Sequence, residues 1–426
     1  MSNNGITIKQ KIILTFALLL AAFLITAVAI IYNALFLDAT NIARARFAEN
    51  PLTVFFIVPL AFLTSAYLSK YFAPNSAGNG TAHVLSALSK LDKEPSAKVD
   101  EYLGGKTILL TIISSIICCA GGGALGSEGP IVQISGSIIL LVGLCFKKYF
   151  PDIDMRRWII AGSAAGFAIV FNTPFAGILF AIEELRQFRP TRKFSLFDIK
   201  APFVVFIGIV VARYISEFET TSKTILTFPE TNLELHPSLL LSLLLVAVLS
   251  GASANIMARI IDKLTKLRQA ANGKTWFLFP ILFGLLVALV SFFVGSHSFG
   301  SGMPDIEIAM ETSKAILPFD GLFGRFINII ASLSAGCAGG ILLPSLAMGA
   351  YIGSAVSALM SLEDARILIS IGMAAFLGSM IRAPLTTTIL VLEITGQTWL
   401  AFPMIICSLL SLRTTELLYR IFRPKF

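Results

Sequence analysis

The stretch GALGSEGPIVQISGSI, residues 123–138, decides how this sequence folds, because it interrupts a long apolar segment with glycines, one acid and a proline. Between Thr107 and Phe146 the only charged side chain is Glu128. A proline fits the first turn of a helix, where a missing N–H costs nothing, and the glycines before it let the backbone approach a ligand closely. The stretch therefore predicts the start of a broken helix with Pro130 in its first turn and the Glu128 carboxylate at its N-terminus.

The composition of the 426-residue chain places it in a lipid bilayer. Hydrophobic residues make up 56% of the chain and charged residues only 14%, with a mean hydropathy of +0.82, which is rare in soluble domains. An apolar run of about 20 residues crosses the hydrocarbon core as a helix. Such uncharged runs recur at Ile12–Leu37, Leu52–Ser69, Trp276–Met303 and Phe326–Leu362. The first run is too long for a signal-peptide core and lacks a cleavage pattern, so it predicts a retained leading helix.

The charges and cysteines exclude several other classes of protein. The net charge of +8 is typical of Lys and Arg flanking membrane segments, and no soluble module carries a basic cluster that would bind nucleic acid. The chain has neither a phosphate-loop pattern nor a His, Cys and Asp cluster with ligand spacing, so no ATP, metal or other cofactor is expected. All five cysteines lie in apolar segments and are predicted to be buried thiols.

The chain contains an internal repeat. The segment GSAAGFAIVFNTPFAGILFAIEEL from Gly162 matches GMAAFLGSMIRAPLTTTILVLEIT from Gly372 at a constant offset of 210 residues over its glycine, alanine, proline and glutamate positions. Upstream, GSEGPIVQISGSI pairs with GGILLPSLAMGAYIG, and GNGTAHVLSAL from Gly78 pairs with GSGMPDIEIAM from Gly300. Three blocks in the same order in both halves indicate a duplication.

A duplicated membrane protein is typical of a transporter whose substrate site lies where the repeats meet. Broken helices at membrane depth line an enclosed or wet cavity, and a helix N-terminus offers free N–H groups and partial positive charge to an anion. The turns Gly126–Pro130 and Gly340–Pro344 are therefore predicted to face one anion. Alternatively, the glycines only allow close helix packing, which explains Ala164 and Ala165 but not the acid in one of the turns.

Glu128 is a functional candidate because an ionisable group at membrane depth is expensive. Its carboxylate can occupy the anion position, and on taking a proton or moving away it vacates that position for a diffusible anion. Proton and anion would then compete for overlapping space. The alternative is a structural acid paired with Lys or Arg, but no basic residue lies near it in the sequence.

These motifs resemble those of the CLC family of chloride channels and chloride/proton exchangers, over about Leu60 to Leu410. GSEGP is similar to the family's G-(K/R)-E-G-P signature with Ser127 in place of the basic residue, and GGILLP is similar to G-x-F-x-P with Leu342 in place of the phenylalanine. The resemblance implies an all-α polytopic membrane protein of two inverted-topology repeats with tilted and broken helices. It also implies that Glu128 is the external gate and proton acceptor.

The resemblance places a second acid at Glu184, as the internal proton relay of exchangers. In the repeat, Glu183 has a counterpart in Glu393 whereas Glu184 faces Ile394. A shared acid suggests a structural role such as bonding to backbone donors, and an unshared acid suggests a role in one half only. The spacing alone indicates that Glu183 and Glu184 lie at a solvated helix end.

Two departures from the family pattern affect the substrate and the coupling. GNGTA places Asn79 where the family's G-S-G-I-P has the serine of the anion site; an amide also donates hydrogen bonds to an anion, but asparagine there resembles the fluoride/proton branch. The family's inner-gate tyrosine has no clear match in RTTELLYRIFRPKF, where the candidates are Phe426 and Tyr419. A looser inner gate would weaken coupling.

The sequence thus predicts a non-enzymatic exchanger of a small monovalent anion, with chloride first and fluoride as the alternative, against protons. A passive or weakly coupled anion channel is the other alternative. The anion-binding groups are expected at Asn79, Ser127, Gly129, Ile341 and Leu342. The expected organisation is an N-terminal segment 1–51, halves 52–217 and 236–426, and a connector 218–235, in a homodimer in a prokaryotic inner membrane.

Overall fold

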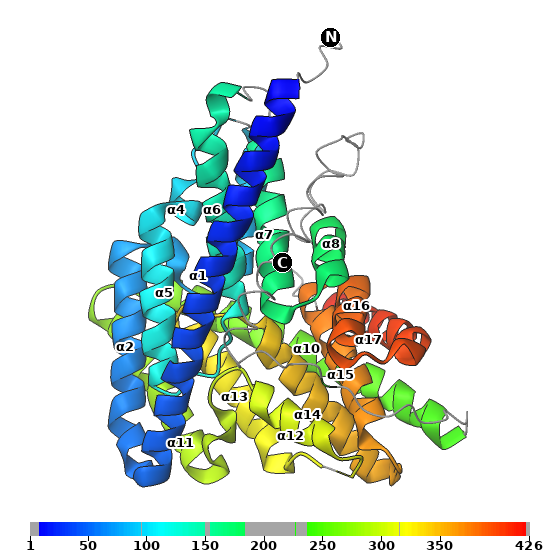
Figure 1. Cartoon of the computed structure of the whole chain (residues 1–426). Helices are drawn as coiled ribbons and strands as arrows, with labels where there is room; N and C mark the ends of the chain where they lie inside the picture. The colour runs from blue at the N-terminus through cyan, green and yellow to red at the C-terminus, as the bar shows by residue number, and fades with distance from the viewer. Residues whose placement is uncertain are drawn as a thin grey trace.

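The structure is a computed structural model that describes residues 8–94, 96–149, 154–183, 226, 237–314 and 316–422. These residues form α-helices joined by short turns and 3₁₀ segments, with no strand among them (Figure 1). The first half contains α1 (Ile8–Glu49), η1 (Pro51–Thr53), α2 (Val54–Phe72), η2 (Pro74–Ser76), α3 (Gly80–Lys93), α4 (Asp100–Leu103), α5 (Gly105–Ala120), α6 (Glu128–Cys145), η3 (Lys147–Tyr149), α7 (Met155–Phe171) and α8 (Pro174–Glu183). The second half contains α10 (Pro237–Ala270), α11 (Lys274–Val294), η4 (Ser296–Ser298), α12 (Met303–Glu311), α13 (Phe319–Ala335), α14 (Leu342–Met360), α15 (Ala365–Ile381), α16 (Pro384–Thr395), η5 (Thr398–Leu400) and α17 (Ala401–Ile421).

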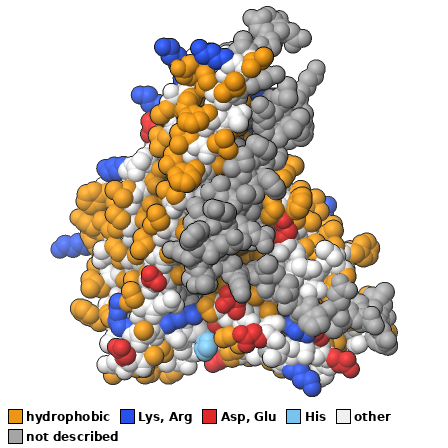
Figure 2. Space-filling view, viewed as in Figure 1, with side chains coloured by type: hydrophobic (Ala, Val, Ile, Leu, Met, Phe, Trp, Pro, Cys, Tyr) orange, Lys and Arg blue, Asp and Glu red, His pale blue; other side chains and the backbone are white. Residues whose placement is uncertain are grey.

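The helices fit a protein that spans a membrane several times. Within the described residues, eight helices are long and apolar enough to cross a bilayer, and α8, α15 and α16 are shorter apolar helices. Hydrophobic side chains cover much of the face in Figure 2, and many charged side chains gather at the lower end of this view. The interrupted apolar pattern of the sequence therefore corresponds to long spans mixed with short, broken helices.

Helix α1 is longer than the leading helix predicted at residues 12–37. It has 42 residues, or about 63 Å at 1.5 Å per residue, which exceeds the roughly 30 Å hydrocarbon core. Its C-terminal extension is held by two arginines: Arg44 donates to the Phe299 carbonyl (3.3 Å) and Arg46 to the Ala120 carbonyl (3.4 Å). The helix runs obliquely across the molecule and packs on α5, α6 and α7 (Figure 1), so it lies beside the first half rather than apart from it.

The repeat found in the sequence is present in the structure. Helices α7 and α15 both have 17 residues, and each begins with an aspartate that caps it: Asp154 accepts from the Arg156 N–H (3.1 Å) and Asp364 from the Arg366 N–H (3.0 Å). Each helix also ends in a left-handed residue at the matching position, Asn172 with φ 53° and Arg382 with φ 57°. The two halves share local backbone conformation as well as sequence.

The repeated acids Glu183 and Glu393 cap each other's helices. At the end of α8, the Glu183 carboxylate accepts hydrogen bonds from the N–H groups of Leu385 (3.1 Å) and Thr386 (2.6 Å) at the start of α16. Near the end of α16, Glu393 accepts from Phe175 (3.1 Å) and Ala176 (2.8 Å) at the start of α8. Each carboxylate thus satisfies free N–H groups at a helix N-terminus, where negative charge is favourable. The structural role predicted for the shared acid is confirmed.

Removing either cap should destabilise the protein, because a hydrogen bond to a charged group contributes about 1.5–3 kcal/mol. We expect Glu183→Ala and Glu393→Ala each to lower the free energy of unfolding by about 2–3 kcal/mol, measured by thermal unfolding in detergent. Glu416→Ala is the control, because Glu416 makes a surface ion pair with Arg413 (2.9 Å) and such pairs contribute at most about 1 kcal/mol. Equal effects of all three variants would contradict the capping role.

The prediction of buried cysteines is correct for four of the five, and the predicted connector lies almost wholly outside the described residues. Cys118, Cys119, Cys337 and Cys407 are buried free thiols, as predicted, but Cys145 is exposed, because it is the last residue of α6, where the helix leaves its neighbours. The predicted boundary at residue 217 and the connector 218–235 lie outside the described residues, apart from Leu226.

Candidate functional site

The two glycine-flanked turns meet at one place. Gly126 N–H donates to the Gly340 carbonyl (2.9 Å), and Gly340 N–H donates to the Gly126 carbonyl (2.6 Å). Beside this antiparallel bridge, Gly78 forms a parallel bridge with Ala338, in which Gly78 N–H donates to the Cys337 carbonyl (2.9 Å). The starts of α3, α6 and α14 are therefore tied together by backbone hydrogen bonds between the two halves.

The backbone hydrogen bonds of this junction connect positions that correspond to each other in the two repeats. Gly126 and Gly340 are counterparts in the repeat, so their bridge joins matching positions of the two halves. The bond from Gly78 to Cys337 also has a counterpart, because Gly300 N–H donates to the Gly123 carbonyl (3.0 Å). The turns thus meet where the two repeats meet, which is where the repeat pattern predicts a substrate site.

Only glycine fits at the centre of this junction. A Cβ at Gly340 would lie 2.6 Å from the Gly129 nitrogen and 2.8 Å from Glu128 Oε2. A Cβ at Gly129 would lie 2.5 Å from Asn79 Oδ1, and a Cβ at Gly126 would overlap the Glu128 carboxylate. The glycines therefore serve close backbone approach, and they bring the predicted residues Asn79, Glu128 and Gly129 into one group.

Glu128 is fully buried, with 0% exposure, as the first residue of α6. Its Oε2 accepts a hydrogen bond from the Leu343 N–H (3.4 Å) in the first turn of α14, and the backbone N–H groups of Ser127 and Glu128 also face the carboxylate. No Lys, Arg or His pairs with it among the described residues. The alternative of a structural acid with a cationic partner therefore finds no such partner there, and the carboxylate lies between two helix N-termini.

Leu343 is a donor that the sequence reasoning missed. The predicted donors on this side are Ile341, the N-cap of α14, and Leu342, its first residue, which lie two positions and one position before Leu343. All of the first four N–H groups of a helix lack partners within the helix, so Leu343, the second residue of α14, could have been included on that ground alone.

A second missed residue is Asn33 on α1. The Ser127 hydroxyl donates to Asn33 Oδ1 (2.7 Å) and lies 3.5 Å from Glu128 Oε1. Asn33 is the only carboxamide in the uncharged run Ile12–Leu37, and polar groups inside membrane helices usually mark functional positions. This lone amide was the signal in the sequence.

Asn79 is the N-cap of α3, and its Oδ1 accepts from the Thr81 N–H (3.3 Å). That bond uses the amide oxygen, so the two donors of the Asn79 side chain stay available; among the described residues they have no hydrogen-bond partner. The amide oxygen of Asn79 is the atom that lies beside Gly129, and the role of Asn79 as a donor to an anion stays a prediction.

The counterpart of the Asn79 turn in the second half is closed by a buried ion pair. Fully buried Arg325 donates to the carbonyls of Gly300 (3.2 Å) and His297 and to Asp305 Oδ2 (2.8 Å), which also accepts from the Tyr351 hydroxyl (3.0 Å). Burial alone would raise the pKa of Asp305, but the hydrogen bond to His297 and the Arg325 charge hold this pKa below its usual range. The start of α12 is thus filled by protein groups, and the two halves differ in structure here.

The remaining predicted residues lie elsewhere. Glu184 and Phe426 are outside the described residues. Tyr419 is on α17 with 47% exposure, and its ring lies against the guanidinium groups of Arg259 (5.0 Å) and Arg382 (5.9 Å) rather than in the group around Glu128. An inner-gate role for Tyr419 or Phe426 stays a prediction.

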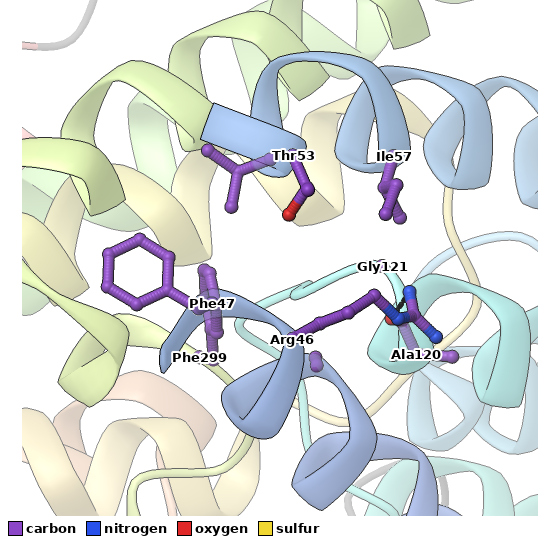
Figure 3. A pocket seen from close by; sticks show the side chains of 9 residues that line it. Arg46, Phe47, Thr53, Ile57, Ala120, Gly121 and Phe299 are labelled. Carbon is purple, nitrogen blue, oxygen red and sulfur yellow. Dashed lines mark hydrogen bonds between the residues drawn. The ribbon is translucent and has the colours of Figure 1, made fainter. Parts of the chain in front are cut away.

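A separate, shallow pocket lies where the end of α1 meets the start of α2 (Figure 3). Phe47 and Phe299 pack edge to face at its wall, with ring centroids 5.7 Å apart, and Arg46 points toward the Ala120 carbonyl (Figure 3). The residues that line it are largely apolar and include none of the group around Glu128, so this pocket is not the candidate site.

The fold and the site define a polytopic membrane transporter of two related halves whose broken helices start at one buried carboxylate. The profile of the voltage-gated chloride channel family matches residues 60–416. The chain is 30% identical over 387 residues to the H(+)/Cl(-) exchange transporter ClcA of Yersinia pseudotuberculosis, covering 86% of this chain and 76% of that protein. It is 31% identical over 373 residues to ClcA of Klebsiella pneumoniae, covering 83% and 75%. The chain belongs to the CLC family, as its motifs predicted.

Solved structures share the fold. A slow cyanobacterial Cl-/H+ antiporter superimposes with a TM-score of 0.77 at 21% identity, covering 94% of this chain and 95% of that one. A CLC-type fluoride/proton antiporter superimposes with a TM-score of 0.76 at 20% identity, covering 97% and 98%. The all-helical fold of two inverted repeats predicted from the sequence is confirmed.

The central glycines give a test of the junction. Gly340→Ala would place a methyl group 2.6 Å from the Gly129 nitrogen, and such overpacking costs about 1–3 kcal/mol. We expect a lower thermal unfolding midpoint than that of wild type. The matched control is Gly105→Ala at the start of α5, where a Cβ meets nothing within 4 Å and alanine is the better helix former. A midpoint for Gly340→Ala as high as that of Gly105→Ala would show that the two turns are not in close contact.

Proposed function

We propose that this protein exchanges a small monovalent anion, chloride first, for protons across the membrane. The observation that carries the proposal is the position of the Glu128 carboxylate, which is fully buried and bonded to the Leu343 N–H at the start of α14 while itself starting α6. Two helix N-termini that accept a carboxylate also suit a halide, because both offer N–H groups and partial positive charge to any small anion.

Proton transport and anion transport are coupled because the Glu128 carboxylate and the anion occupy the same position. While ionised, Glu128 fills the position between the helix starts and excludes another anion. A proton neutralises the carboxylate and weakens its attraction to the N–H groups, so the side chain leaves and an anion takes its place with Asn79, Gly129 and the first turn of α14. Return of the carboxylate needs loss of the proton and of the anion. Proton and anion thus alternate at one point, which is the requirement for exchange.

The inward path of the proton is assigned to Glu184. The neighbouring acid Glu183 is engaged with the N–H groups of Leu385 and Thr386, which supports leaving the relay to Glu184. The relay role itself comes from the family resemblance.

A buried cation supports an anion as the cargo. Arg268 at the end of α10 is 8% exposed, and among the described residues no acid pairs with it. Its guanidinium lies against Gly336, where a Cβ would be 2.6 Å from Nη1, so it adjoins the segment that leads to Gly340. A positive charge at Gly336 that has no acidic partner among the described residues attracts anions and repels cations.

The relatives support chloride, since the proteins about 30% identical to this chain are H(+)/Cl(-) exchange transporters. Asn79 favours a second candidate, fluoride/proton exchange, because an amide beside Gly129 replaces the serine hydroxyl of the family pattern. A protein of this function belongs in the inner membrane of a prokaryotic cell, and a homodimer is typical of the family.

Glu128→Gln tests the exchange mechanism. Glutamine keeps the size of the side chain but cannot carry the charge or the proton, so we expect anion flux to persist and proton flux to fall to background. Both fluxes are measured together in proteoliposomes under an anion gradient, for chloride and for fluoride. Glu94→Gln, an exposed acid, is the control that leaves both fluxes intact. Proton movement that continues in Glu128→Gln would remove Glu128 from the mechanism, and a wild-type reversal potential indifferent to a pH gradient would identify a channel.

Arg268→Gln tests the attraction of anions. We expect anion flux at low ionic strength to fall several-fold and the loss to shrink as salt screens the charge. Lys263→Gln is the matched control, because it removes an exposed cation from the same helix and changes the net charge equally. Equal effects of the two variants at every salt concentration would contradict a local role for Arg268.

A further inference from the structure

Helix α1 contributes a side chain to the site from outside the residues that the family profile matches. The family profile starts at residue 60, whereas Asn33 lies in the middle of α1 and touches Ser127. Ser127 in turn stands where the family motif has a basic residue. Two side chains that the family signatures do not include therefore adjoin the buried carboxylate.

Asn33 and Glu128 compete as acceptors for the hydrogen of the Ser127 hydroxyl. A serine hydroxyl has a single O–H donor. It points at Asn33 Oδ1, with 2.7 Å between the oxygens, while Glu128 Oε1 lies at 3.5 Å. The first distance is that of a good O–H···O bond and the second is at the outer limit of one. The Ser127 hydroxyl therefore donates mainly to Asn33 on α1, and its hydrogen bond to the Glu128 carboxylate is weak.

We propose that Asn33 is a positioning residue that keeps the Ser127 hydroxyl away from Glu128 and so keeps the carboxylate free to take a proton and leave. The inference rests on the exchange mechanism proposed above. A hydroxyl that donates to an ionised carboxylate makes a short and strong charge-assisted bond, which favours the charged form. Without Asn33, Ser127 makes that bond, the ionised carboxylate is held in the anion position, and more acid is needed to release it.

No other side chain around Glu128 among the described residues can change the hydrogen bonding of its carboxylate in this way. Two titratable groups interact with Glu128 through space: Tyr32 on α1 and Cys119 on α5. Tyr32 is engaged with Ser115, with 2.7 Å between the two hydroxyl oxygens, and no charged side chain pairs with Glu128 among the described residues. The Ser127 hydroxyl is the one side-chain donor that reaches the carboxylate there, so the choice of its acceptor decides whether the carboxylate gains a donor.

A double-mutant cycle tests the inference. Anion and proton fluxes are measured against pH in proteoliposomes for wild type, Asn33→Ala, Ser127→Ala and the double variant. We expect Asn33→Ala to need about ten-fold more protons for half-maximal flux, a shift of about one pH unit to the acid side, equivalent to about 1.4 kcal/mol. The shift should vanish in the Ser127→Ala background, because the hydroxyl that causes it is absent. Wild-type coupling in the same preparation reports on exchange itself, so a wild type without exchange overturns the proposed function rather than this inference alone.

Two further variants separate positioning from a general loss of packing. Tyr32→Phe removes the hydrogen bond to Ser115 one residue away on α1 and should leave the pH midpoint unchanged. Asn33→Asp keeps an oxygen acceptor for the Ser127 hydroxyl and should show no acid shift. An unchanged midpoint in folded Asn33→Ala, or the same shift with and without Ser127, would overturn the role of Asn33. An acid shift in Asn33→Asp would also overturn it.

Discussion

The bridge between Gly126 and Gly340 is the contact on which the site depends. Two reciprocal hydrogen bonds of 2.9 and 2.6 Å join matching positions of the two halves and bring the N-termini of α6 and α14 to one point. Side chains at these positions would collide with backbone or with the carboxylate, so the junction requires glycine. Because the N–H groups of both helix starts then converge without partners of their own, the site favours negative charge, and Glu128 supplies it from within the chain.

The duplicated halves use some matching positions in the same way and others differently. The acids shared by both halves, Glu183 and Glu393, are fixed by backbone donors and stabilise the packing of α8 on α16. At the helix starts the halves differ, since the Asn79 amide N–H groups have no hydrogen-bond partner among the described residues, whereas the counterpart turn is filled by Arg325. A buried ion pair costs desolvation that its own hydrogen bonds must offset, and here several carbonyl and carboxylate acceptors do so.

Most of the fold and the centre of the site could be predicted from the sequence, because both depend on patterns local to the chain. Apolar runs define spans, Gly and Pro define the broken helices, and the repeat shows that Gly126–Pro130 and Gly340–Pro344 are equivalent. The contacts with Leu343 and Asn33 depend on side-chain direction and on packing of α1 against α6, neither of which periodicity encodes. The length of α1 was underestimated for a related reason: its polar end is stabilised by carbonyls of residues 120 and 299, far away in the sequence.

The position of α1 also bears on why Ser127 is acceptable where the family has a basic residue. A cation next to the carboxylate would attract both Glu128 and the incoming anion, so it would raise anion affinity while holding the gate closed. A serine contributes no charge, and the strength of its one hydrogen bond depends on which acceptor it meets. With Asn33 at 2.7 Å, the acceptor is supplied by a helix that precedes the residues matched by the family profile. In the proposed mechanism, the packing of α1 therefore adjusts the balance between proton and anion at Glu128 without altering the glycine junction that forms the site.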